Sequence, residues 1–83
     1  MLECPADLRR LSGRKVLFRW DCGWLLGIVK NPIRKGKYNY FVRYLEEDGK
    51  YAEYRHALKA VNYYKIEDEN DVGLWFLINQ DQD

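Results

Sequence analysis

Apolar and polar residues alternate along several short stretches of this 83-residue chain. Over 14–20 and 38–44 apolar side chains recur at every second position, which is typical of a strand with one buried face, and 51–55, after a predicted turn, is read as a further strand. A nearly continuous apolar run over 24–29 predicts a second strand, and the fully apolar run over 74–78 suits a buried closing strand. The pattern therefore predicts five short strands.

The segments between these strands carry turn signals. Asp and Gly residues over 21–23 and 46–49 predict tight turns, and the Asn-Pro and Gly signals over 30–37 predict a loop. Gly27, inside the second strand, indicates a bulge or a close approach of two backbones. Short strands at this spacing favour a small barrel or sandwich.

Two further stretches have helical character. Residues 6–11 place Leu8 and Leu11 on one face of a predicted helical turn, which Ser12 and Gly13 end. Residues 56–64 predict one helical turn followed by an extended piece.

The length supports a single small domain. We predict a lead-in over 1–12, a barrel over 13–79 that includes an acidic loop over 65–71, and a tail over 80–83 that frays.

A content of 47% hydrophobic and 33% charged residues is typical of a globular chain. The net charge of +1 is unevenly distributed: residues 1–44 hold ten Lys/Arg against three Asp/Glu, whereas residues 45–83 hold four against ten. No apolar run approaches the roughly 20 residues that span a bilayer, and the first residues lack a signal-peptide pattern. We therefore expect a soluble, intracellular protein without a membrane segment.

Candidate catalytic and metal-binding residues are few. Cys4 and Cys22 with the single His56 do not make up a zinc ligand set, and both thiols are expected to be free. The sequence holds no nucleophile paired with a base and no phosphate-binding glycine pattern. We predict no catalytic residue, no metal and no cofactor.

Recognition is the better hypothesis, because nine of the thirteen aromatic residues lie between Phe18 and Tyr54, with Glu46, Glu47 and Asp48 among them. Aromatic faces attract weakly hydrated cations, and a carboxylate adds Coulomb attraction. An aromatic strand face edged by acid is thus one way to bind an alkylated ammonium group.

The order of these elements is characteristic: an aromatic strand over 13–20 (Gly-Arg-Lys-Val-Leu-Phe-Arg-Trp), a glycine-centred strand over 23–29 (Gly-Trp-Leu-Leu-Gly-Ile-Val), Tyr-Asn-Tyr-Phe-Val-Arg-Tyr over 38–44, and Glu-Asp-Gly-Lys-Tyr over 47–51. It resembles the Tudor and Agenet domains of the Royal superfamily. The resemblance covers roughly 13–64. It implies an all-β, five-stranded Src-homology-3-like barrel, with one or two short helical turns.

The resemblance also implies a nuclear, chromatin-associated module that binds methylated lysine or arginine, as on a histone tail. Carried over by position, the partial aromatic cage consists of Trp20, Trp24, Tyr44, Asp48 and Tyr51. Leu25 stands where these families commonly have an aromatic residue. We expect a monomer or one part of a larger protein.

Two alternatives remain open. In the first, the basic residues of the loop bind nucleic acid, with aromatic rings stacking on bases; these residues are Lys30, Arg34, Lys35 and Lys37. The sequence pI of about 7.7 is below that of a dedicated nucleic-acid domain, so DNA or RNA contact is expected to be weak. In the second, the domain is a scaffold barrel for protein–protein interaction.

Overall fold

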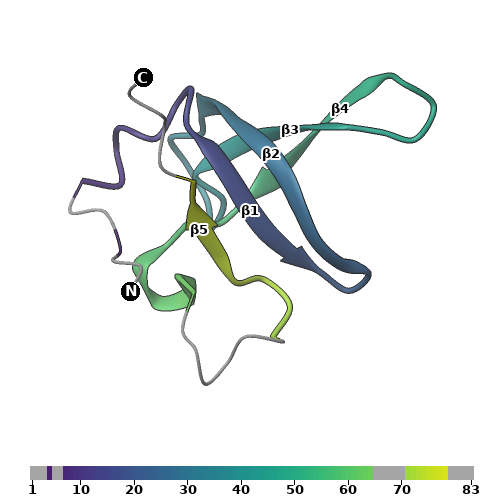
Figure 1. Ribbon diagram of the computed structural model, residues 1–83. Coiled ribbons are helices and arrows are strands. Elements are labelled where there is room, and N and C mark those ends of the chain that lie inside the picture. Colours follow the sequence, from purple (N-terminus) through teal and green to yellow (C-terminus); the bar gives the residue numbers. More distant parts are fainter. Residues whose placement is uncertain (1–3, 5–6, 65–70, 79–83) are drawn as a thin grey trace, which may run out of the picture.

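The computed structural model describes residues 4, 7–64 and 71–78. It contains five strands and one short 3-10 helix: β1 (Lys15–Trp20), β2 (Gly23–Pro32), β3 (Tyr40–Leu45), β4 (Tyr51–His56), η1 (Ala60–Asn62) and β5 (Trp75–Leu77). All neighbouring strands are antiparallel, in the order β4-β3-β2-β1-β5 (Figure 1). The predicted all-β class with five strands and a short helical turn is confirmed. The arrangement is consistent with a small Src-homology-3-like barrel.

The sheet curls but does not close. β4 and β5 are its two edges, and the described residues form no strand pairing between them. β3 and β4 pass behind β2 in Figure 1, so the inward side chains of the first four strands face a shared interior. The segment after η1 returns to β5 through a parallel bridge between Tyr63 and Trp75.

The core lies on the inward side of this curl. It is built from the inward positions of β1 to β3 and from residues outside the first four strands; the fully buried side chains are Leu11, Val16, Val29, Val42, Leu58 and Trp75. Period-two alternation explains the three valines, because every second side chain of a strand points to the same face.

The segment before β1 packs on the sheet. The Tyr40 hydroxyl donates to the Leu8 carbonyl at 2.9 Å and accepts from the Leu11 N–H at 3.2 Å, which holds Leu11 in the core. The helical turn predicted over 6–11 is wrong for the described part, since residues 7–11 contain only an isolated turn. Its one turn hydrogen bond, from the Arg10 N–H to the Asp7 carbonyl, is long at 3.4 Å.

β2 runs further than predicted, so Lys30 belongs to the strand and not to a loop. The register shifts between Val29 and Pro32, where a bulge lets proline enter the strand. A bulge tolerates proline because one residue leaves the hydrogen-bond ladder there. The predicted tail over 80–83 and the acidic loop over 65–71, except Asp71, lie outside the described residues.

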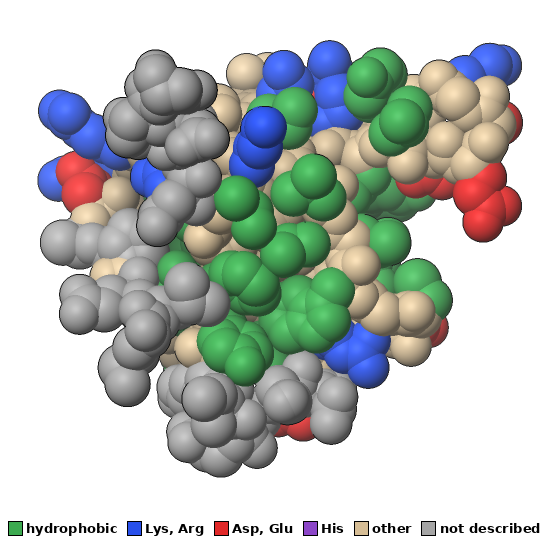
Figure 2. Space-filling view, viewed as in Figure 1, with side chains coloured by type: hydrophobic (Ala, Val, Ile, Leu, Met, Phe, Trp, Pro, Cys, Tyr) green, Lys and Arg blue, Asp and Glu red, His purple; other side chains and the backbone are tan. Residues whose placement is uncertain are grey.

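The outward face of the sheet is unusually apolar. Figure 2 shows hydrophobic side chains gathered at the centre of the face over β1, β2 and β5. An antiparallel sheet with one solvated face ordinarily carries polar residues there.

Candidate functional site: an aromatic corner at the end of β1

Three aromatic rings meet on the inward face of the sheet, at the C-terminal end of β1. We call these residues, Trp20, Tyr44 and Tyr54, the aromatic corner. The centroid of the Trp20 ring lies 5.4 Å from that of Tyr44 and 5.3 Å from that of Tyr54. Both pairs are edge-to-face, and the Tyr44 and Tyr54 centroids lie 6.0 Å apart. These are the separations at which aromatic rings attract each other.

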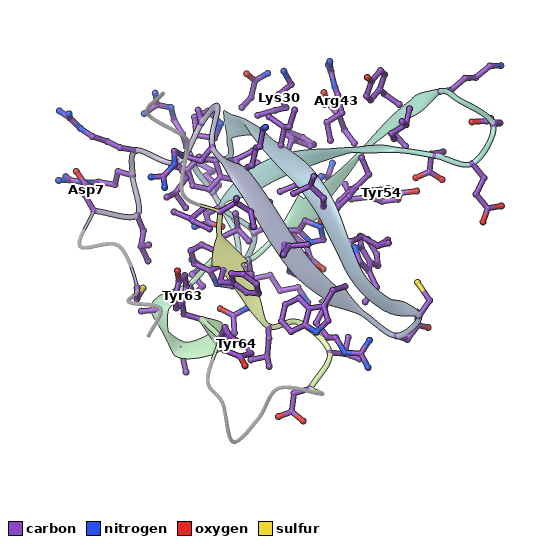
Figure 3. All side chains as sticks on the ribbon, in the orientation of Figure 1. Asp7, Lys30, Arg43, Tyr54, Tyr63 and Tyr64 are labelled. Carbon is purple, nitrogen blue, oxygen red and sulfur yellow. The ribbon has the colours of Figure 1, made fainter. Side chains whose placement is uncertain are left out.

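Strand register brings the three rings together. Tyr44 pairs with Ala52 across β3 and β4, so Tyr54, two residues further, lies on the same inward face (Figure 3). Trp20 is the last residue of β1 and shares its face with Phe18. The corner therefore draws one residue from each of three strands.

Gly27 makes room for the Tyr44 ring. A Cβ atom at this position would lie 2.7 Å from Cε1 of Tyr44 and 2.7 Å from Cγ1 of Val42. Side chains essentially never approach so closely, so only glycine fits here. The close approach predicted from the sequence is thus an approach of β3 side chains to the β2 backbone.

His56 contacts the aromatic corner through a hydrogen bond to Tyr44 and packs against Phe18. Its Nε2 atom lies 2.9 Å from the Tyr44 hydroxyl, and its ring stacks on Phe18 with centroids 3.9 Å apart. Burial lowers the pKa of His56 from 6.5 to about 4. The imidazole is therefore neutral at pH 7, and Nε2 accepts the hydroxyl hydrogen when the ring proton is on Nδ1.

Burial also raises the pKa of Tyr44 above its ordinary value, although the nearby indole N–H of Trp20 acts in the opposite direction. That N–H is buried and has no hydrogen-bond partner among the described residues. Tyr44 thus stays a neutral phenol at physiological pH, and its side chain is only 3% exposed.

The accessible part of the corner is formed by Trp20, which is half-buried, and Tyr54, which is 40% exposed. The Tyr54 hydroxyl lies 3.5 Å from the Glu46 carboxylate. Leu25 is 42% exposed, and it lies on the inward face because it pairs with Phe18. The corner thus offers two aromatic rings, an aliphatic side chain and a nearby carboxylate, which suits a weakly hydrated cation.

The other predicted cage residues lie elsewhere. Tyr51 points outward, is 65% exposed, and has the guanidinium of Arg43 at 5.8 Å from its ring centroid. Asp48 accepts a hydrogen bond from the Lys50 N–H at 2.9 Å inside the hairpin turn. Trp24 packs on the outward face. The structure therefore joins Trp20 with Tyr44 but does not bring these three residues to them.

Sequence reasoning missed Tyr54, although a signal for it existed. Alternation in β4 puts Ala52, Tyr54 and His56 on one face and Tyr51 on the other. The pairing of Leu45 with Tyr51 decides which of these faces turns inward. The length of the hairpin turn sets that pairing, and it was not known from the sequence.

The predicted basic residues form no single cluster. Arg34 lines a groove of about 430 Å³ together with Arg9 and Lys59, over a floor that includes Pro32 and Tyr40. Its other lining residues are Leu8, Ile33 and Asn39.

The remaining predicted basic residues do not line this groove. Lys35 and Lys37 are exposed, and the Lys37 ammonium lies 5.2 Å from the centroid of the Tyr38 ring. Lys30 is half-buried in β2.

The described residues contain no group of three or more His, Cys, Asp or Glu side chains that could hold a metal ion. Within the same part of the chain, no helix has the length and apolar character needed to cross a bilayer. No protein-family model, curated protein or solved structure matches this chain. The function must therefore be inferred from the geometry of the aromatic corner and the surfaces around it.

Proposed function

We propose that this domain is a non-catalytic, chromatin-associated recognition module of Tudor-like type, which binds a methylated lysine or arginine side chain at the aromatic corner. The observation that carries the proposal is the meeting of Trp20, Tyr44 and Tyr54 in one place, with Glu46 beside Tyr54. A methylated histone tail in the nucleus is the corresponding partner.

The three rings of the aromatic corner have different roles. Tyr44 is almost fully buried and hydrogen bonded to His56, so it positions the other two rings. Trp20 and Tyr54 expose part of their surface, and the methylated cation packs against them. Because the rings already touch edge-to-face, the ligand lies over a shallow surface instead of entering a deep cage.

The energetic expectation is modest. A cation–π contact contributes about 0.5–2 kcal/mol, so two such contacts supply at most about 4 kcal/mol, and we expect an affinity no tighter than the micromolar range. Glu46 adds a charge-assisted hydrogen bond to any N–H that methylation leaves on the ligand. Lower methylation states are therefore preferred over the fully methylated one.

An NMR titration tests this proposal with peptides that differ only in the methylation of one lysine or arginine. The Tyr54→Leu variant is compared with Tyr51→Leu, which changes the same residue type on the same strand but on the outward face. We expect methyl-dependent shifts at Trp20 in the wild type and in Tyr51→Leu, and their loss in Tyr54→Leu. Equal shifts with methylated and unmethylated peptides would contradict the proposal.

A second candidate function is nucleic-acid binding at the groove that Arg9, Arg34 and Lys59 line. The observation in its favour is that three cationic side chains and, among the described lining residues, no carboxylate line this groove, although Arg9 is also paired with Asp7 at 3.1 Å; such an arrangement suits phosphate. Titration with duplex and single-stranded DNA at two salt concentrations tests it. Shifts around Arg34 that weaken steeply with salt support this function, and their absence at low salt rules it out.

A further inference from the structure

The outward face of β5, β1 and β2 carries an apolar surface that is separate from the aromatic corner. We call it the outer patch, and it consists of Leu17, Trp24, Leu26, Ile28, Tyr64 and Phe76. Register explains it, because Leu17 pairs with Leu26 on one side and with Phe76 on the other. Figure 2 shows hydrophobic side chains at the centre of this face.

One end of the outer patch is an aromatic cluster. The Trp24 centroid lies 5.3 Å from that of Phe76 and 5.8 Å from that of Tyr64, and Tyr64 lies 5.3 Å from Phe76. All three rings are only partly buried. The other end is aliphatic, where Leu26 is 55% exposed and Ile28 is exposed beside it. A contiguous exposed apolar surface of this kind marks an interaction site.

Within the part of the chain that the structure describes, the charged cross-strand neighbours of the outer patch are all basic. Lys15 and Arg43 are the cross-strand neighbours of Ile28 on its two sides, and Arg19 is the neighbour of Trp24. No outward position of β1, β2 or β5, all of which lie within the described residues, carries a carboxylate. Glu53 of β4 pairs with Arg43 at 2.8 Å.

The basic residues beside the outer patch favour one kind of binding partner over the others. A symmetric dimer through this face would place the same cations of both copies against each other, which is unfavourable. Single-stranded nucleic acid is bound through rings on which bases stack, but the middle of this surface is aliphatic, and the Trp24 ring packs edge-to-face on Tyr64 and Phe76. A partner segment with apolar side chains and carboxylates satisfies both the apolar centre and the basic neighbours.

We propose that the outer patch is a second binding surface, which takes an acidic peptide segment with bulky apolar side chains. The segment's apolar side chains pack on Leu26 and the aromatic cluster, while its carboxylates face Lys15 and Arg19. The surface lies on the opposite side of the sheet from the aromatic corner, so this proposal does not depend on methyl-ligand recognition.

The test is an NMR and fluorescence titration with a synthetic peptide of alternating Glu and Leu residues. Two control peptides replace all Leu by Ser or all Glu by Lys. We expect shifts at Leu17, Leu26 and Phe76 with the Glu-Leu peptide, and responses to both controls weaker by about tenfold or more.

Leu26→Glu and Leu25→Glu form a matched pair of variants. The two leucines are adjacent and similarly exposed, but they lie on opposite faces of β2. Leu26→Glu is expected to weaken the peptide about tenfold, and Leu25→Glu to change its affinity by less than about threefold. Lys15→Glu, which removes no apolar surface, is expected to weaken it as well.

The proposal would be overturned if the Glu-Leu peptide gave no response, if its shifts were confined to Trp20 and Tyr54, or if Leu25→Glu and Leu26→Glu weakened its binding equally. Concentration-dependent dimerisation through this face, or stronger shifts at this face with DNA than with the peptide, would also overturn it. Native-like spectra of both leucine variants provide the check on folding. Methylated peptides report on the aromatic corner in the same spectra, so failure at one surface is distinguishable from failure at the other.

Discussion

Trp20 and Trp24 lie four positions apart, on either side of the same β1–β2 turn, yet they belong to different regions of the molecule. Trp20 faces the interior, where it meets Tyr44, Tyr54 and the His56 ring. Trp24 faces outward and packs on Tyr64 and Phe76. Residue type alone is thus a poor guide to role, because the face of the sheet decides whether an aromatic ring joins the core or a surface.

The two regions also differ in how firmly they are held. The inward rings are constrained by a buried hydrogen bond, by stacking and by the space that Gly27 leaves. In the outer patch, the Trp24, Tyr64 and Phe76 rings pack on one another, and Leu26 and Ile28 are exposed to solvent. Changes on the inward side should therefore cost stability, and changes on the outward side should cost little.

Acidification is expected to have the largest effect on the inward region. His56 has a pKa of about 4 in the fold, against 6.5 when unfolded, so the unfolded chain binds more protons between these values. Its contribution to stability is complete above pH 6.5 and is lost as pH falls toward 4. The loss amounts to roughly 3 kcal/mol, at about 1.4 kcal/mol per pKa unit.

Urea unfolding at several pH values measures this loss, and the range from 5 to 6.5 isolates His56 because the chain has no other histidine. The His56→Gln variant, which does not titrate, is the control. An equal pH slope for the two proteins over that range would contradict the assignment.

Gly27→Ala should be the next most damaging change. The new Cβ would clash with the Tyr44 ring and with Val42, so β2 or β3 must shift. Overpacking of this kind costs about 1–3 kcal/mol. Denaturant unfolding measures the loss, and the same variant should reduce methyl-dependent shifts because Tyr44 positions the corner. Unchanged stability would show that the strands adjust freely.

Tyr44→Phe removes one hydroxyl and leaves Nε2 of His56 without its partner. A buried polar atom without a partner costs about 1–3 kcal/mol, and we expect a loss of stability in this range. Tyr51→Phe, at an exposed position, serves as the control and should be neutral. Thermal unfolding of both variants makes the comparison, and equal midpoints would remove the structural role of this hydrogen bond.

Leu26→Ser should have the smallest effect on folding, within about 0.5 kcal/mol, because the side chain is 55% exposed. Its unfolding midpoint in urea is compared with that of Val42→Ala, a fully buried position on the inward side. A loss for Leu26→Ser comparable to that of Val42→Ala would mean that the outer patch belongs to the core.

The strands were predictable because their signals are local. Alternation gave the positions of β1 and β3 to within a few residues, the turn signal over 46–49 gave the start of β4, and the apolar run over 74–78 gave β5. The end of β2 was predicted wrongly, because Asn-Pro is an ordinary loop signal and only the pairing with β3 reveals a bulge. The helical turn predicted over 6–11 from the spacing of Leu8 and Leu11 did not form either, and Leu11 instead packs into the core.

The candidate site was predictable only in part. The sequence singled out Trp20 and Tyr44, and their rings do meet. Tyr51 was chosen in place of Tyr54 because resemblance supplies a position in the chain, whereas the length of the β3–β4 turn determines which face that position occupies.

By itself, the sequence determined the class of the fold, the alternation within each strand and the wealth of aromatic side chains between Phe18 and Tyr54. Only the tertiary structure decided which rings share a face, that His56 is buried neutral beside Tyr44, and that an apolar surface remains on the outward side. The physical reason is that strand-forming patterns act within a few residues, whereas register, curl and burial are set by contacts between strands that are distant in the chain.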